Sequence, residues 1–234
     1  QRLAEQEKQR LAEQKDEELE VEIQRLKQQG GLFTEGLLTF LKLDFKAQLP
    51  ENVKLLESAN VKNENNEPLG YLSLTDSIKN KKGTMRIENI SKSKAFSDWE
   101  VGFKLKMNSG DGSNPGNGFS LNIGNNLPKS VSRAEEGTGT GIRICFDTYG
   151  SGKSTKDPAI DVWYANKKLL KQQSFAPVPD LYRENDKETY FKDPNTGNEV
   201  SLLTDEKWED VTIKVEERFF TLKYKGYTII NEPL

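Results

Sequence analysis

Two aspartates ten residues apart, Asp147 and Asp157, offer the clearest chemistry in this sequence. Asp147 ends a run of alternating apolar residues, and a loop rich in Gly, Ser, Thr and Lys separates it from Asp157. Two carboxylates presented in this way can supply hard oxygen ligands to one cation, and calcium takes about six to eight such oxygens, backbone carbonyls included. The same side chains can instead cap turns through hydrogen bonds to nearby backbone. The spacing therefore indicates either a calcium site or two turn-capping aspartates.

The amino-acid composition excludes several classes of enzyme and binding site. The 234 residues include no histidine and a single cysteine. Catalysis by Ser-His-Asp or Cys-His groups is therefore excluded, as are Cys/His zinc sites and an internal disulfide framework. The formal net charge of −3 argues against a nucleic-acid-binding module, since such modules need a basic face. No apolar run approaches the roughly 20 residues of a membrane-spanning helix, so no membrane span is expected.

Three further motifs have plainer explanations. Residues 147–154 end like a phosphate-binding loop, but Asp147 stands where that motif needs glycine, and a β-like segment follows it instead of a helix. The Gly-rich run 137–141 precedes a strand, which is the wrong order for a dinucleotide fingerprint. Cys145 lies within a predicted strand, where a buried apolar cysteine is the expected environment. A glycosidase-type pair of carboxylates stays open, because the sequence does not give their separation.

The first 29 residues predict a long helix. They repeat QRLAEQEK as QRLAEQKD, contain no Gly, Pro or aromatic residue, and end before Gly30 and Gly31. Leu19, Ile23 and Leu26 have the spacing of a coiled-coil seam. The helix is either a coiled-coil stalk that joins this chain to a protein partner or a solvated single-helix spacer held by charge pairs.

After a linker over residues 30–40, the pattern predicts an antiparallel β-sandwich over residues 41–234. Short alternating runs are separated by Gly, Asn, Pro and Asp clusters, and no stretch between them suits an amphipathic crossover helix. About ten strands is the count of a two-sheet jelly roll. Residues 171–200 are expected to form a long surface excursion. The predicted strands are 38–45, 70–75, 84–90, 98–107, 118–124, 141–147, 159–165, 211–217, 219–225 and 227–230.

From about residue 41 onward the chain resembles the concanavalin-A-like jelly roll of L-type lectins and laminin-G-like domains. Residues 72–90 are similar to the family's strand–Gly–strand opening, and residues 98–124 to its long core strand and the strand that follows. The strongest piece is FDTYGSG followed by DPAIDVWY, which resembles the family's metal loop. The late hairpin beginning at Trp208 is similar to the family's W-x-x-V-x-I element. The resemblance implies a mainly β, antiparallel two-sheet sandwich, here preceded by a coiled-coil helix.

The resemblance also implies a set of calcium ligands. Asp147 matches the metal-bridging aspartate, Tyr149 the residue that offers its backbone carbonyl, and Asp157 the second calcium aspartate. Ser151 stands where the family has an asparagine ligand. Cys145 occupies the position of the glutamate that holds the family's transition metal, and the histidine needed there has no counterpart. Calcium is therefore the candidate cofactor, and the transition-metal site is absent.

The sugar-binding positions that the resemblance implies are Asn117, Gly118 and Gly139. Asn117 replaces an aspartate that, in the family, accepts hydrogen bonds from sugar hydroxyls. An amide oxygen still accepts such a bond but lacks its charge-assisted strength. The substitution weakens the case for lectin-type sugar binding.

These observations predict a non-enzymatic binding or structural interaction module, carried on its stalk within a larger assembly protein. Protein partners are expected through the N-terminal helix and the sandwich faces. The alternative is a calcium-assisted carbohydrate-binding domain, with a glycan as ligand. A glycoside hydrolase on the same fold rests on fold analogy alone. An SPRY-type sandwich is the alternative fold.

Two expectations concern context. Further strands close the sheet in the family, so the sandwich is expected to lack its closing strands and the chain to be a piece of a longer protein. The single cysteine and the charged helix favour a cytoplasmic or cytoskeletal location. Many relatives of the family are secreted, so an extracellular location is the alternative.

Overall fold

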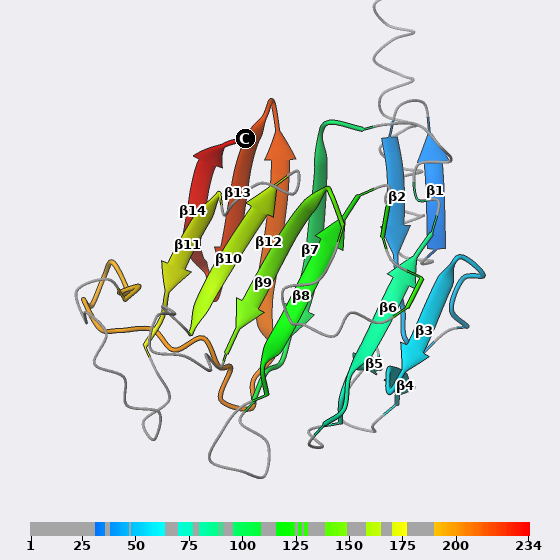
Figure 1. Ribbon diagram of the computed structural model, residues 1–234, viewed down its shortest axis with the longest axis horizontal. Coiled ribbons are helices and arrows are strands. Elements are labelled where there is room, and N and C mark those ends of the chain that lie inside the picture. Colours follow the sequence, from blue (N-terminus) through cyan, green and yellow to red (C-terminus); the bar gives the residue numbers. More distant parts are fainter. Residues whose placement is uncertain are drawn as a thin grey trace, which may run out of the picture. The chain divides into compact units, whose positions relative to one another are not determined.

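In the part of the chain that the computed structural model describes, β-strands are joined by loops (Figure 1). The stalk predicted for residues 1–29 lies outside the described residues, and among the residues that are described no helix could cross a membrane. The described residues are 31–35, 38–46, 48–63, 70–76, 80–88, 90, 96–108, 116–124, 126–127, 129–130, 139–148, 158–164, 170–176 and 190–234.

The chain divides into two compact units, Gln1–Leu74 with Thr84–Lys94, and Thr75–Gly83 with Ala95–Leu234. The first unit contains three two-stranded pairs. They are β1 (Gly31–Glu35) with β2 (Leu38–Lys42), β3 (Val53–Glu57) with β6 (Gly83–Ile87), and β4 (Asn60–Lys62) with β5 (Tyr71–Ser73). Strand β1 thus falls within the segment assigned to the linker, while the predicted domain bounds stay a prediction.

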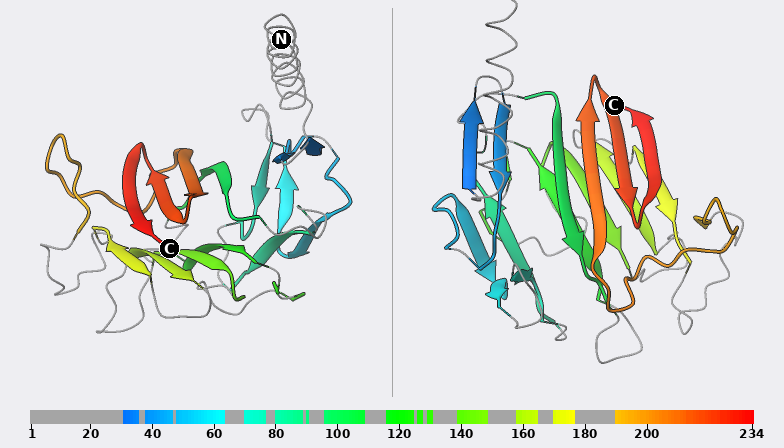
Figure 2. Two further views of the ribbon diagram at one scale, coloured as in Figure 1. Left: turned by 90° about the horizontal axis from the view of Figure 1, so that it is seen from above. Right: turned by 180° about the vertical axis from the view of Figure 1, so that it is seen from behind.

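The second unit is a sandwich of two antiparallel four-stranded sheets, which lie face to face in Figures 1 and 2. Sheet I has the order β11-β10-β9-β8, and sheet II the order β14-β13-β12-β7. The strands of sheet I are β8 (Gly118–Ile123), β9 (Ile142–Asp147), β10 (Ala159–Tyr164) and β11 (Lys171–Ser174). Those of sheet II are β7 (Trp99–Leu105), β12 (Glu209–Glu216), β13 (Phe219–Tyr224) and β14 (Tyr227–Pro233). The prediction of a mainly β, antiparallel two-sheet sandwich is confirmed.

Strict alternation of apolar and polar residues builds the core between the sheets. In β12, Val211, Ile213 and Val215 are buried while the intervening residues face outward. Aromatic rings connect the two inner faces: Phe146 of β9 meets Tyr224 of β13 with ring centroids 5.7 Å apart. Such edge-to-face pairs add to the stability that burial itself supplies.

The outer face of sheet II is charged and solvated. Lys104 of β7 pairs with Asp210 of β12 at 2.8 Å, and Lys214 pairs with Glu216 at 2.7 Å, all with well-exposed side chains. Exposed pairs of this kind contribute little to stability. The charged side chains therefore make the outer face of sheet II hydrophilic and add little to its stability.

The prediction that residues 171–200 form a surface excursion is wrong for residues 171–176 and 190–191, whereas residues 192–199 are mostly exposed, as expected. Lys171–Ser174 forms β11, and the side chains of Phe175 and Tyr190 are buried. The ring of Phe191 lies 5.8 Å from that of Phe175. The physical reason is that these aromatic residues fill the edge of the core, which a composition rich in Pro, Asp, Lys and Asn does not reveal.

Candidate functional site

The predicted site residues Gly118 and Asp147 meet at one end of sheet I. Gly118 begins β8 and pairs with Asp147, which ends β9, and Asp147 in turn pairs with Ala159 at the start of β10. Asn117 lies immediately before this row and is exposed. Three neighbouring strand ends thus meet at a common edge, which carries the polar residues Asn117 and Asp147 and which we call the Asp147 edge.

Gly118 is required at this edge by its backbone conformation. Its φ of 134° is one that residues with side chains rarely adopt. A Cβ at this position would collide with the carbonyl group of Phe146, whose carbon would be 3.1 Å away and whose oxygen would be closer still. The glycine therefore permits β8 to approach the end of β9.

Thr148 fixes the loops on either side of the edge. Its backbone N–H donates to the carbonyl of Asn117 at 3.1 Å, and its buried hydroxyl donates to the carbonyl of Gly116 at 2.5 Å. These bonds hold the residues before β8 against the residue after β9. Asn117 and Asp147 are therefore presented by an ordered backbone.

The calcium ligands implied by the resemblance are only partly described. Asp147 is half-buried and belongs to an existing set of interactions, while Tyr149, Ser151 and Asp157 lie outside the described residues. Within the described ranges, no three Asp, Glu, Cys or His side chains gather as metal ligands. The Asp147 carboxylate has the hard-oxygen chemistry that calcium prefers.

Gly139 lies at the other end of the β8–β9 pair, away from Asn117 and Gly118. It precedes β9, and a Cβ built on it would lie 3.2 Å from Leu127 and 3.6 Å from the side-chain oxygen of Asn126. That oxygen accepts hydrogen bonds from the backbone N–H and the hydroxyl of Thr140, at 2.9 and 2.8 Å. The structure thus separates the three implied sugar-binding positions, whose role stays a prediction.

Buried Cys145 occupies the outer side of β9, on the face that carries Asp147. Its burial is as expected from the sequence, but its surroundings are not apolar. It pairs with Ser120 of β8 and Asp161 of β10. Its neighbours are thus more polar than an apolar core position would have.

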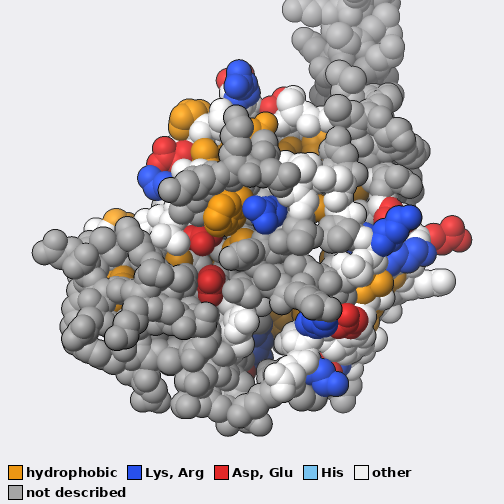
Figure 3. Space-filling view, viewed as in Figure 1, with side chains coloured by type: hydrophobic (Ala, Val, Ile, Leu, Met, Phe, Trp, Pro, Cys, Tyr) orange, Lys and Arg blue, Asp and Glu red, His pale blue; other side chains and the backbone are white. Residues whose placement is uncertain are grey.

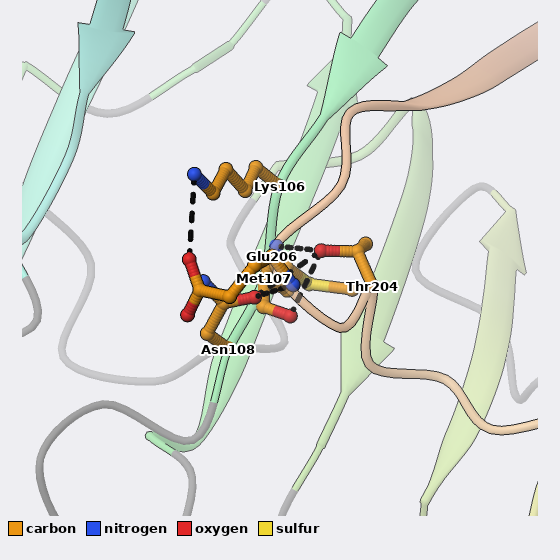
Figure 4. A network of polar contacts seen from close by, with 5 residues as sticks. All are labelled: Lys106, Met107, Asn108, Thr204 and Glu206. Carbon is orange, nitrogen blue, oxygen red and sulfur yellow. Dashed lines mark hydrogen bonds and ion pairs between the residues drawn. The ribbon is translucent and has the colours of Figure 1, made fainter.

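A polar network, not foreseen from the sequence, links the residues that follow β7 to the turn before β12 (Figure 4). Thr204, which is buried, donates its backbone N–H to the carbonyl of Met107 at 2.9 Å and accepts the N–H of Met107 at 3.0 Å through its hydroxyl oxygen. Asn108 accepts the backbone N–H of Glu206 at 3.1 Å, and Lys106 pairs with the Glu206 carboxylate at 3.4 Å. The turn before β12 is thereby fastened to the end of β7.

A second support joins the same turn to the core. The hydroxyl of Tyr224 donates to the carbonyl of Leu202 at 2.8 Å, and the ammonium of Lys225 donates to the carbonyls of Ser201 and Leu203. Burial raises the pKa of the Tyr224 phenol far above its ordinary value, and nearby acidic residues raise it further. Burial lowers the pKa of Lys225, although nearby acidic residues oppose the change. The Tyr224 hydroxyl and the Lys225 ammonium therefore have a structural role, which is to hold the backbone of residues 201–203.

Replacing Tyr224 by Phe is expected to cost about 1–3 kcal/mol at neutral pH, because the carbonyl of Leu202 loses its buried donor. Tyrosines ionise near pH 10 when unfolded, whereas native Tyr224 stays neutral there, so wild-type stability falls as the pH rises above 10. At pH 11 the wild type loses about 1.4 kcal/mol of unfolding free energy in this way. The Tyr224→Phe variant does not, so the difference in stability between the two proteins is smaller at pH 11 than at pH 7. Urea unfolding at pH 7 and pH 11 checks this. Tyr164→Phe, at an exposed tyrosine, is the control, and a deficit independent of pH would contradict the prediction.

The fold is of the two-sheet sandwich class, and its two antiparallel four-stranded sheets are consistent with a concanavalin-A-like sandwich. One solved structure to which the chain is similar is the VIP36 exoplasmic/lumenal domain in its Ca²⁺/Man-bound form. The TM-score is 0.50 with 16% sequence identity, over 78% of this chain and 70% of that one. No protein-family model and no curated protein sequence matches the chain. At this identity the likeness shows the fold.

Proposed function

We propose that this chain is a non-enzymatic binding module, a lectin-like β-sandwich that serves interaction within a larger assembly protein. One observation carries the proposal: at the Asp147 edge, exposed Asn117 and half-buried Asp147 stand at neighbouring strand ends that the core and the Thr148 bonds hold in place. A rigid scaffold that displays polar loops suits recognition. The sequence also lacks histidine, the commonest general base.

The experiment applies the whole chain to an array of glycans, with calcium and with chelator, and incubates it with soluble polysaccharides. We expect no release of reducing ends and no tight retention that needs calcium. Turnover that is lost on mutating a pair of carboxylates would overturn the proposal in favour of a hydrolase. Tight, calcium-dependent retention would favour the second candidate.

The second candidate is a calcium-assisted carbohydrate-binding domain. The pairing of Gly118 with Asp147 favours it, because this places the implied sugar-binding and calcium-binding residues at a common edge. VIP36, which is similar in fold, was solved with Ca²⁺ and Man bound. In this chain, Asp147 with Tyr149, Ser151 and Asp157 would hold the ion, which would supply positive charge and fix the loop.

Replacing Asp147 by Ala tests the second candidate. If calcium binds the native state, saturation at about 100 times its Kd adds roughly 2.7 kcal/mol of stability and raises the Tm by several degrees. Asp147→Ala should abolish that rise and the retention of sugar together. Asp210→Ala, which removes an exposed carboxylate from sheet II, is the matched control. The absence of any calcium effect on the unmutated chain would contradict this candidate.

A further inference from the structure

Asn117 and Gly118, which lie where the chain enters β8, form the only Asn-Gly dipeptide in the sequence. An asparagine that precedes a glycine can react with its own chain, because the backbone nitrogen of the glycine can reach the side-chain carbonyl carbon and close a ring. Glycine has no side chain to hinder that approach. Both residues are exposed, so water reaches them. The dipeptide therefore brings an electrophile, a nucleophile and solvent together at the Asp147 edge.

The hydrogen bond from Thr148 fixes the direction of the Gly118 N–H. The carbonyl of Asn117 accepts the backbone N–H of Thr148 at 3.1 Å, and so points toward the end of β9. In a planar trans peptide the C=O and the N–H point in opposite directions, so the N–H of Gly118 points away from β9. Strand β8 is the last strand of sheet I, so within the described part of the chain no further strand of that sheet pairs on this side. The Gly118 nitrogen thus lies outside the ladder.

Asn122, on the same strand, shows the opposite arrangement. Hydrogen-bonded and non-hydrogen-bonded pairs alternate along an antiparallel ladder, and Gly118 begins β8 with a non-hydrogen-bonded pair. Ile123 is an odd number of residues further on, so its N–H lies within the ladder to β9. The amide nitrogen of Asn122 donates to the hydroxyl of Ser120 at 3.1 Å, and its side-chain oxygen is buried. Asn122 is therefore an internal reference that the same chemistry should spare.

We propose that Asn117 deamidates through attack by the backbone nitrogen of Gly118, and that this modification loosens the Asp147 edge. The nitrogen gives its proton to water or hydroxide and bonds to the side-chain carbon Cγ. The bond between Cγ and Nδ2 then breaks, and ammonia leaves with a proton from solvent. Water opens the resulting cyclic imide at either of its carbonyls, which yields aspartate or isoaspartate. The reaction needs no oxidant or reductant, and its two reacting groups are held together by the chain itself.

The isoaspartate product changes the backbone where the Asp147 edge is held together. In isoaspartate the chain runs through the former side chain, so one extra atom lies between the Cα of residue 117 and the nitrogen of Gly118. The carbonyl of residue 117 accepts the Thr148 N–H, and the carbonyl of Gly116 accepts the Thr148 hydroxyl at 2.5 Å. The longer backbone cannot keep both bonds and the pairing of Gly118 with Asp147 in their present geometry. The segments before β8 and after β9 therefore separate.

The aspartate product keeps the backbone but adds a negative charge near Asp147. Asn117 immediately precedes Gly118, which pairs with Asp147, so the new carboxylate and the existing one stand at neighbouring strand ends and repel each other. Figure 3 views the molecule from the side of sheet I, and the basic and acidic side chains that it colours are interspersed, so the added charge is a local change. Both products thus weaken the Asp147 edge. This inference needs no ligand and rests on neither proposed function.

The test incubates the full, folded chain at neutral and at mildly alkaline pH, and peptide mass spectrometry detects the replacement of NH₂ by OH. We expect Asn117 to convert before Asn122 and before Asn231, whose side-chain oxygen accepts the hydroxyl of Thr221 at 2.9 Å. The rate should rise about tenfold per pH unit, as the deprotonated fraction of the attacking amide does. In Asn117→Gln, the matched amide, ring closure needs one more atom and should not occur over the same period. Hydrogen exchange at the Thr148 amide should quicken as the wild type converts, but not in Asn117→Gln.

Three results would overturn the inference. One is that Asn117 stays intact in the folded chain during the time in which the urea-unfolded chain converts, since the fold would then block the attack. The second is that Asn122 converts as fast as Asn117, which would deny strand geometry any role. The third is conversion of Asn117 with unchanged exchange at Thr148, which would show that the edge is not loosened. All three measurements use the wild-type chain, so the inference is tested even if the variant does not fold.

Discussion

Replacing Phe146 by Ala should cost about 3–5 kcal/mol of unfolding free energy, the largest loss we expect from a single side chain. The ring is completely buried between the sheets and contacts the rings of Phe119 and Tyr224, with centroids 5.7 Å away in each case. Removing it forfeits the transfer energy of an aromatic side chain and leaves a cavity that two hydrogen-bonded sheets cannot close. Because Phe146 pairs with Phe119 in register, the loss should also loosen the β8–β9 pair.

Urea unfolding followed by tryptophan fluorescence measures this loss. All three tryptophans belong to Ala95–Leu234, so their signal reports the sandwich alone. Phe219→Ala is the matched control, because that ring is 44% exposed and its removal should change stability by no more than about 0.5 kcal/mol. Equal effects of the two variants would show that the sheets do not enclose the core as described here.

The sandwich was predictable wherever a strand alternates. The inner residues of β12 and the long alternating run of β7 have the period of two that one buried face imposes, and both strands appear where the pattern predicts them. The antiparallel arrangement followed from the short connections and the lack of crossover helices. These features are local, so one sequence suffices to infer them.

Strands that carry few apolar residues were not predictable. Lys171–Ser174 has the sequence KQQS, and Asn60–Lys62 has NVK, neither of which alternates. Strand β11 forms because β10 offers its backbone for pairing, as Asp161 and Gln172 show by their register. Tertiary context overrides local preference in such segments.

The candidate site also has features that the sequence predicts and features that only the structure shows. The sequence placed Asp147 at a strand end and Gly118 at a strand start, but only the register between β8 and β9 shows that they are neighbours. The bonds of Thr148 had no sequence signal beyond a threonine that follows a strand-ending aspartate.

Replacing Gly118 by Ala should destabilise the sandwich by about 3 kcal/mol and disturb the Asp147 edge. Two effects add: a φ of 134° that alanine adopts only with strain, and a Cβ that collides with backbone atoms of Phe146. The collision cannot be relieved cheaply, because Phe146 is held by strand pairing on one side and by the core on the other. The chain must open the row between Gly118 and Asp147, which carries the residues implied in ligand binding.

Gly102→Ala separates these effects from the general cost of losing a glycine. Gly102 lies within β7, no atom lies within 4 Å of a Cβ built on it, and its φ is not positive. Alanine there should be neutral or stabilising by about 0.4–1 kcal/mol, since it restricts the unfolded chain. Thermal unfolding of both variants, with amide spectra of the residues flanking Asp147, makes the comparison. If Gly118→Ala were as stable as Gly102→Ala, β8 could not approach β9 so closely at that end. The Asp147 edge would then lose the geometry that supports binding.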